Sequence, residues 1–204
     1  MPESRAKVFI VDDNPAVLGS MCKLLESLSY EVRTFLEGRA FLAACDGESP
    51  DCAIIDVRVP DVSGLAMQEA LAQKKPHLPV IILTGYADVP TAVRAMKAGA
   101  IDFIEKPASE LALLEAVQTA VHRAREDEKA RSATSALQQR LGRLTARERE
   151  ILKQILIGGS AKEIAKALAL SPRTVETHRA NIMAKTGANS IAHLIWMAMT
   201  ARMD

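Results

Sequence analysis

The chain has few of the residues that mark disulfide-bonded or membrane proteins. Only 3 of its 204 residues are cysteine, only 3% are aromatic, and no apolar run is long enough to span a membrane. The three thiols lack metal-ligand spacing, and the N-terminal stretch MPESRAKVFIV lacks the apolar core of a signal peptide. We therefore expect reduced thiols and a cytoplasmic protein without a membrane partner.

A formal net charge of +1 hides an unequal distribution. Residues 1–125 hold 13 Lys and Arg against 17 Asp and Glu, whereas residues 126–204 hold 13 against 8. An acidic first part and a basic second part indicate two tasks, and the second part can face a polyanion.

The first part alternates short apolar runs with amphipathic stretches of helical spacing. Several runs are continuously apolar, as in central strands of a parallel sheet covered on both faces. Five strands alternating with five helices predict an α/β doubly wound domain. We place strands at 7–12, 30–35, 51–57, 79–84 and 100–105, and helices at 15–28, 38–45, 64–74, 89–98 and from 109 onward.

The second part begins with a predicted long helix. From Ser109 to about Arg140 the chain has no Gly or Pro, which favours one helix that ends near Gly142; a coil after Arg131 is the alternative. Helix-start signals then predict four short helices. The signals are the capping boxes Thr145–Glu148 and Ser160–Glu163, the pair Ser171-Pro172, and Asn189 or Ser190.

Polar residues stand where the predicted strands end. The carboxyl ends of parallel strands meet at one edge of a sheet, where ligands bind. Three carboxylates there suit Mg²⁺, and one of them can act as a nucleophile towards phosphorus. A hydroxyl and an ammonium can hold the phosphoryl oxygens. The residues concerned are Asp12, Asp13, Asp56, Thr84 and Lys106.

Two other interpretations of these residues remain open. A single Asp at a strand end usually caps a helix, although five such groups at four strand ends are hard to explain by capping. A phosphohydrolase of the aspartyl-phosphate type is the second alternative. Such enzymes typically carry paired acids two residues apart on one strand, a pattern that this sequence lacks.

Residues 5–122 resemble the receiver domain of a bacterial two-component response regulator. This resemblance implies a flavodoxin-like (βα)5 fold and a phosphoacceptor that is not an enzyme beyond self-phosphorylation and autodephosphorylation. The segments that carry it are VDD at 11–13, IIDVRVPDVSG at 54–64, ILTGYAD at 82–88 and MKAGAIDFIEKP at 96–107.

The resemblance also implies roles for the residues at the strand ends. Asp56 would accept a phosphoryl group from a sensor histidine kinase. Asp13, Asp56 and the backbone carbonyl of Arg58 would coordinate Mg²⁺, and Asp12 would act mostly through water.

The resemblance implies a switch as well. Thr84 and Lys106 would contact the phosphoryl group, and Thr84 and Phe103 would change orientation together. Pro107 would bend the chain, with a cis bond as one way to do so. Receiver domains of this family usually have Phe where Ala108 stands, which can loosen the packing of the last helix.

The segment 160–187 predicts a helix, a short turn and a second helix. This is the pattern of a helix-turn-helix, whose second helix enters the major groove of DNA. A helical docking domain with a charged solvated face is the alternative. At 3.6 residues per turn, the outward positions of the second helix are Arg173, Glu176, Thr177, Ala180 and Ala184.

Residues 144–190 resemble the LuxR-type helix-turn-helix of the FixJ/NarL family. Members often have Lys at the positions of Glu176 or Ala180, so this chain is expected to read a different site with less charge. The resemblance implies base contacts from Glu176, Thr177 and Ala180, and we expect phosphate contacts from Lys162, Arg173, Thr174 and Arg179.

Together these features predict a phosphorylation-controlled regulator of transcription. We expect a receiver at 1–122, a helical linker at 123–140 and a small all-α helix-turn-helix domain at 141–204. Phosphorylation would favour a homodimer on double-stranded DNA, where the protein would act with RNA polymerase as an activator. The last predicted helix, at 190–201, has a broad apolar face, so Leu194 and Trp196 could pair with a second copy; the alternative is that this face only closes the core of the domain. A phosphorylation-independent regulator is the remaining alternative.

Overall fold

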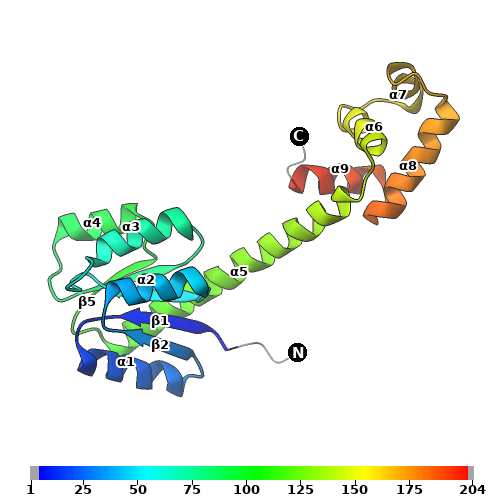
Figure 1. The fold of residues 1–204 in the computed structure, drawn as a ribbon. Helices are drawn as coiled ribbons and strands as arrows, with labels where there is room; N and C mark the ends of the chain where they lie inside the picture. The colour runs from blue at the N-terminus through cyan, green and yellow to red at the C-terminus, as the bar shows by residue number, and fades with distance from the viewer. Residues whose placement is uncertain (1–4, 202–204) are drawn as a thin grey trace. The chain divides into compact units, whose positions relative to one another are not determined.

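The computed structural model describes residues 5–201, which form two compact units that divide between Glu128 and Lys129. The first unit is a parallel five-stranded sheet in the order β2-β1-β3-β4-β5 (Figure 1). The predicted α/β doubly wound fold is confirmed. Its strands are β1 (Lys7–Val11), β2 (Glu31–Phe35), β3 (Cys52–Asp56), β4 (Val80–Thr84) and β5 (Asp102–Glu105), and its helices are α1 (Pro15–Ser27), α2 (Gly38–Gly47), α3 (Gly64–Lys74), α4 (Val89–Lys97) and the first part of α5 (Glu110–Gly142).

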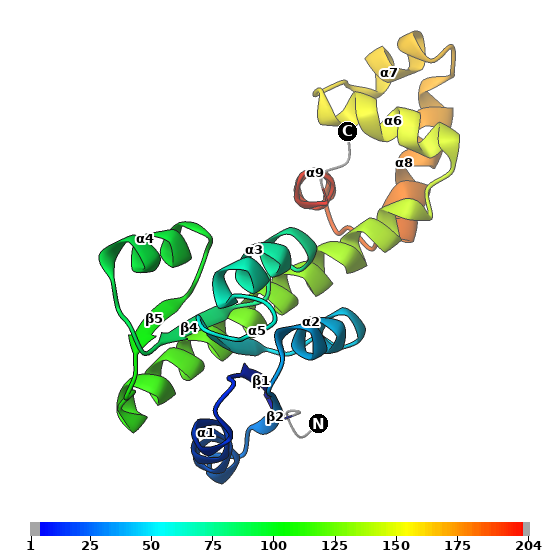
Figure 2. The same cartoon turned by 60° about the vertical axis from the view of Figure 1, so that its left-hand side comes forward.

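Helices cover both faces of the sheet, as the continuously apolar strands require. Side chains alternate along each strand, so Val8 and Ile10 of β1 pack against α1 and α5, whereas Phe9 and Val11 pack against the helices α2, α3 and α4. Figure 2 shows the two helical layers on opposite sides of the strands. The buried strands place the residues that follow them at one edge of the sheet.

The second unit consists of the last part of α5 and the short helices that follow it. The helix α5 is continuous to Gly142, so the prediction of one long helix is confirmed and the coil after Arg131 is wrong. Both predicted capping boxes and the Ser171 cap are present, and Ser190 rather than Asn189 caps the last helix. The helices are α6 (Ala146–Leu156), α7 (Ala161–Ala167), α8 (Pro172–Thr186) and α9 (Ile191–Thr200).

Two further predictions concern the whole described chain. The cysteines Cys22, Cys45 and Cys52 are free thiols. Over residues 5–201, each helix is too short or too polar to cross a membrane.

Candidate functional site

Three carboxylates meet at the carboxyl ends of β1 and β3, and we call Asp12, Asp13 and Asp56 the acidic rim. One oxygen atom from each lies within 4.8 Å of the others. Asp12 and Asp56 are buried, whereas Asp13 is exposed. Strands β1 and β3 are direct neighbours in the sheet, which explains why residues so far apart in sequence come together.

The ammonium of Lys106 joins two carboxylates of the acidic rim. Its Nζ lies 2.5 Å from Oδ2 of Asp12 and 2.9 Å from Oδ2 of Asp56. Burial opposes the charge of Lys106, but the hydrogen bonds to Asp12 and Asp56 outweigh this effect and raise the pKa of the ammonium. The peptide bond between Lys106 and Pro107 is cis.

The Thr84 side chain is turned towards its own loop. It is buried at the end of β4, and its Oγ1 donates to the carbonyl of Tyr86 at 3.0 Å and accepts from the N–H of Tyr86 at 3.1 Å. Phe103 is half-buried on β5 and packs on the same side of the sheet as α2, α3 and α4. Thr84 and Phe103 lie on neighbouring strands, as the switch hypothesis requires.

The side chain of Arg58 has a contact that the sequence did not reveal. Its guanidinium carbon lies 4.2 Å from the centroid of the Tyr86 ring. We expected only the backbone carbonyl of Arg58 to matter, and Tyr86 was missed. One sequence signal could have indicated both residues. Arg58 follows Asp56 by two positions, and Tyr86 follows Thr84 by two positions.

The chain after Asp56 is held in place by caps and a close backbone approach. Asp61 accepts from the backbone N–H groups of Gly38 and Arg39, each at 2.8 Å, and these bonds lower the pKa of its carboxyl, with Arg39 the larger cause. A Cβ atom on Gly64 would lie 2.2 Å from the carbonyl oxygen of Asp56. Only glycine therefore allows α3 to begin this close to the acidic rim.

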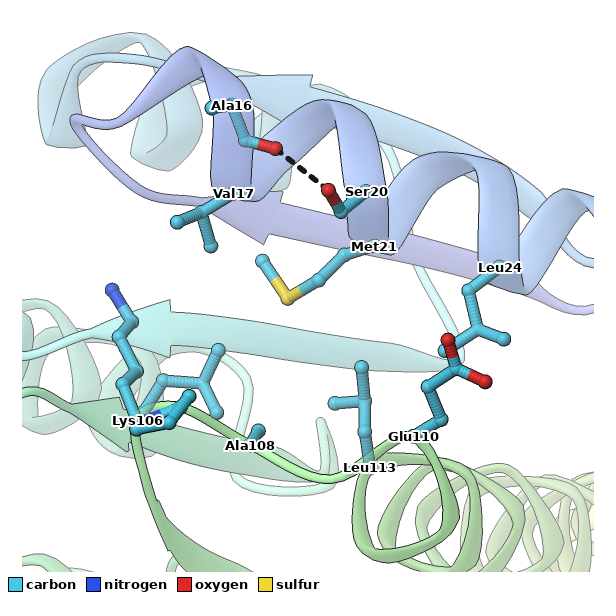
Figure 3. Close-up of a pocket in the computed structure, with 11 residues that line it drawn as sticks. Ala16, Val17, Ser20, Met21, Leu24, Lys106, Ala108, Glu110 and Leu113 are labelled. Atoms are coloured by element: carbon cyan, nitrogen blue, oxygen red, sulfur yellow. Dashed lines mark hydrogen bonds between the residues drawn. The ribbon is translucent and has the colours of Figure 1, made fainter.

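A cavity of about 570 Å³ lies beside Lys106, between α1 and the start of α5. Figure 3 shows Met21 and Leu24 of α1 facing Leu113 of α5 across it, with Ala108 at its floor. The short side chain of Ala108 lines this space without filling it. The looser packing of the last receiver helix stays a prediction.

We expect the substitution Ala108→Phe to stabilise the first unit. A ring placed in the cavity would be removed from water, which contributes about 1 kcal/mol when burial is partial. Urea denaturation followed by circular dichroism measures this change in the free energy of unfolding. The matched control is Ala43→Phe on the exposed face of α2, where the ring would stay in contact with water and should give no gain. A loss of stability in Ala108→Phe would mean that the cavity cannot accept a ring.

In the second unit, α7 and α8 form the predicted helix-turn-helix. Val175 and Ile182 are buried and Met183 is half-buried, so the predicted inward face of α8 is confirmed. The turn contains Ala169 with a φ of +54°, in the region that favours glycine. The predicted outward residues are all exposed: Arg173, Glu176, Thr177, Ala180 and Ala184.

The other predicted phosphate contacts are less uniform in exposure. Lys162 on α7 is exposed, whereas Thr174 and Arg179 are half-buried. Arg179 Nη1 lies 3.1 Å from a carboxylate oxygen of Glu176, one turn earlier on α8. His178 is half-buried on α8.

A buried carboxylate in the second unit was not recognised as such from the sequence. Glu148 is only 3% exposed, and the two oxygens of its carboxylate lie 2.7 and 2.8 Å from Nζ of Lys185. The carboxylate also accepts from the backbone N–H of Thr145 at 2.8 Å. The bond from Lys185, followed by that from Thr145, lowers the pKa of Glu148. The sequence predicted only the capping box, because the partner Lys185 lies 37 residues away.

The two apolar side chains of α9 that we expected at a contact with a second copy differ in their exposure to water. Leu194 is fully buried in the core of the second unit, so the expectation that it pairs with a second copy is wrong. Trp196 is 57% exposed and remains available. The second unit is small, and it needs the side chain of Leu194 to fill its own core.

Two protein-family models match the chain. The response regulator receiver domain matches residues 8–118, and the luxR family of bacterial regulatory proteins matches residues 142–198. The first contains the acidic rim, Thr84 and Lys106, and the second contains the helix-turn-helix.

Relatives match over nearly the full length. The transcriptional regulatory protein FixJ of Bradyrhizobium diazoefficiens is 36% identical over 200 residues, covering 98% of each chain. FixJ of Rhizobium meliloti is 40% identical over 192 residues, covering 94% of each chain.

Solved structures of similar length also match. The response regulator StyR superposes with a TM-score of 0.84 at 36% identity, over 96% of this chain and 98% of that one. Full-length FixJ of B. japonicum superposes with a TM-score of 0.59 at 36% identity, over 98% and 99%. The chain therefore belongs to the FixJ-like two-component response regulators, transcriptional regulators that join a receiver domain to a LuxR-type DNA-binding domain.

Proposed function

We propose that the protein regulates transcription when Asp56 is phosphorylated by a sensor histidine kinase. The observation that carries this proposal is the acidic rim with Lys106 bonded to Asp56 at 2.9 Å. A nucleophilic carboxylate beside an ammonium is the arrangement that aspartyl-phosphate chemistry requires.

The proposed reaction is a single phosphoryl transfer. An Oδ atom of Asp56 forms the new bond to phosphorus as the bond between phosphorus and the donor breaks. The electron pair of that bond leaves with the donor, an imidazole nitrogen for a phosphohistidine or an acetate oxygen for acetyl phosphate. Lys106 then neutralises charge on the transferred group, and Thr84 donates its hydroxyl proton to a phosphoryl oxygen.

The acidic rim has the chemistry of a Mg²⁺ site. Carboxylate oxygens are the ligands that Mg²⁺ prefers, and one oxygen from each of three residues lies within 4.8 Å of the others. We propose that Asp13, Asp56 and the carbonyl of Arg58 are direct ligands and that Asp12 acts mostly through water. When bound, the ion supplies positive charge that offsets the repulsion between the carboxylates and an anionic donor.

We propose that phosphorylation favours a homodimer. Reorientation of Thr84 and Phe103 would alter the surface near α4 and β5. The helix α4 supports this role because it carries exposed apolar side chains at helical spacing, Val89, Val93 and Met96, and such a patch favours association. Trp196 on α9 is a candidate for a second contact between copies.

In the second unit, α8 is proposed to enter the major groove of double-stranded DNA. Glu176, Thr177 and Ala180 would face base edges, where Glu accepts from cytosine and Ala touches a thymine methyl. RNA polymerase is the further partner that an activator requires. The proposed phosphate contacts are Lys162, Arg173, Thr174 and Arg179.

DNA binding by the full chain, treated with acetyl phosphate and Mg²⁺, tests this proposal. Anisotropy of a fluorescent duplex from a random-sequence pool should show binding that falls steeply with salt, because phosphate contacts release counterions. Lys162→Ala should weaken binding to all duplexes and lower the salt slope by about one. Lys74→Ala, on the receiver, is the matched control and should bind like the wild type. No binding at low salt would contradict the proposal.

Two alternatives make different predictions. A phosphorylation-independent regulator would bind DNA equally with and without acetyl phosphate. A phosphohydrolase would release many equivalents of phosphate from an external phosphoester. Neither is favoured by a specific feature of the described residues.

A further inference from the structure

The helix α4 is held on the first unit by very little buried surface. Of its residues Val89–Lys97, only Ala95 is buried, whereas the neighbouring α3 buries five of its 11 residues (Figure 2). Burial of apolar side chains is the main force that holds a helix against the rest of a domain. The packing of α4 therefore depends strongly on what surrounds Ala95.

A buried amide of α3 contacts α4 at this residue. Gln68 is only 1% exposed, and its Nε2 donates to the backbone carbonyl of Ala95 at 2.8 Å. The same carbonyl accepts from the backbone N–H of Ala100 at 3.1 Å, so it would keep a partner without Gln68. The bond therefore satisfies the amide nitrogen of Gln68 rather than an otherwise unpaired group of α4.

The oxygen of the same amide has no partner. A carbonyl can only accept, so the Gln68 amide directs Nε2 to Ala95 and Oε1 away from it. Oε1 is enclosed, and no donor among residues 5–201 reaches it. An unpaired buried acceptor generally costs more free energy than a single hydrogen bond to the same amide returns. Gln68 thus weakens the packing of α4 on α3, where an apolar side chain of similar length would strengthen it.

We propose that Gln68 is a positioning residue that keeps α4 loosely packed, so that this helix can change its place on the first unit. When α4 moves away from α3, water reaches both ends of the amide and the cost of the unpaired oxygen disappears. The exposed apolar residues Val89, Val93 and Met96 lie on this helix. The consequence for dimers rests on the proposed function, whereas the loose packing of α4 does not.

Hydrogen exchange of the unphosphorylated protein tests the packing of α4. Gln68→Met keeps the length of the side chain and removes the amide, so the backbone amides of 89–97 should exchange about 3–10-fold more slowly. Gln68→Leu should act in the same direction. The matched control is Glu69→Gln, which removes the charge of an exposed ion pair with Arg94 of α4 and should raise these rates by less than about twofold. Unchanged or faster exchange in both Gln68 variants would overturn the inference.

Dimer formation separates a positioning role from a merely structural one. Wild type and Gln68→Met are labelled with acetyl phosphate to the same extent, as checked by intact mass, and compared by sedimentation velocity. The association constant of Gln68→Met should be about 3–10-fold lower, because firmer packing disfavours the rearranged α4 by the same factor. An unchanged constant would overturn the positioning role. If the wild type is not labelled or forms no dimer, the proposed function fails, and the exchange rates still decide whether Gln68 loosens α4.

Discussion

Replacing Asp56 with asparagine should reduce phosphoryl incorporation from acetyl phosphate to below detection. An amide is not a nucleophile towards phosphorus at neutral pH, so the bond between Asp56 and phosphorus cannot form. Asp12 and Asp13 remain in the variant, but we assign them to metal binding rather than to the reaction. Intact mass spectrometry should show one added phosphoryl group in the wild type and none in Asp56→Asn.

The control for this substitution is Asp46→Asn. Asp46 is exposed on α2 and pairs with Lys74, so its loss changes the charge by the same amount away from the acidic rim. We expect Asp46→Asn to be labelled at the wild-type rate. Labelling of Asp56→Asn at that rate would show that another residue accepts the phosphoryl group.

Replacing Glu148 with glutamine should destabilise the second unit by about 2–3 kcal/mol. The substitution removes a charge-assisted hydrogen bond to Lys185 and leaves that ammonium without its buried partner. Trp196 is the single tryptophan of the chain and lies in the second unit, so its fluorescence during urea denaturation reports on this unit.

The chain offers a matched control in its second capping box. The Glu163 carboxylate accepts from the backbone N–H of Ser160, as that of Glu148 accepts from Thr145, but Glu163 is exposed to water. Glu163→Gln should therefore move the urea midpoint much less than Glu148→Gln. Equal shifts would mean that capping, rather than the buried bond to Lys185, determines the effect.

The effect of Glu148→Gln should also depend on pH. Lys185 and Thr145 lower the pKa of Glu148 in the folded protein below its ordinary value of 4.5. A lowered folded pKa gives stability that is present above the unfolded pKa and is lost as pH falls through the folded one. The difference between wild type and Glu148→Gln should therefore be largest near neutral pH and shrink below about pH 4.

Local signals in the sequence predicted most of the fold. The apolar runs located the strands, because a strand buried on both faces must be apolar throughout. The capping boxes located helix starts, because the two residues of each box are only three positions apart in the sequence. The acidic rim followed from the rule that strand ends meet at one edge. Helix ends were less well determined: the helix predicted at 38–45 continues to Gly47.

The parts that could not be predicted depend on contacts between distant segments. The bond between Glu148 and Lys185 and the contact between Arg58 and Tyr86 join residues 37 and 28 positions apart, and no local pattern marks such pairs. The apolar face of α9 was recognised, but periodicity alone could not tell that Leu194 is buried and Trp196 exposed. That distinction depends on where the other helices of the unit pack.

The ion pair between Glu176 and Arg179 bears on how such a protein would search a genome. Non-specific binding depends on free positive charge near the phosphates, and any genome offers a great excess of wrong sites. An arginine already paired with a carboxylate on its own helix contributes less to that indiscriminate attraction. We therefore expect a smaller fraction of the protein to be bound to unrelated DNA. More free protein is then available to bind the correct site.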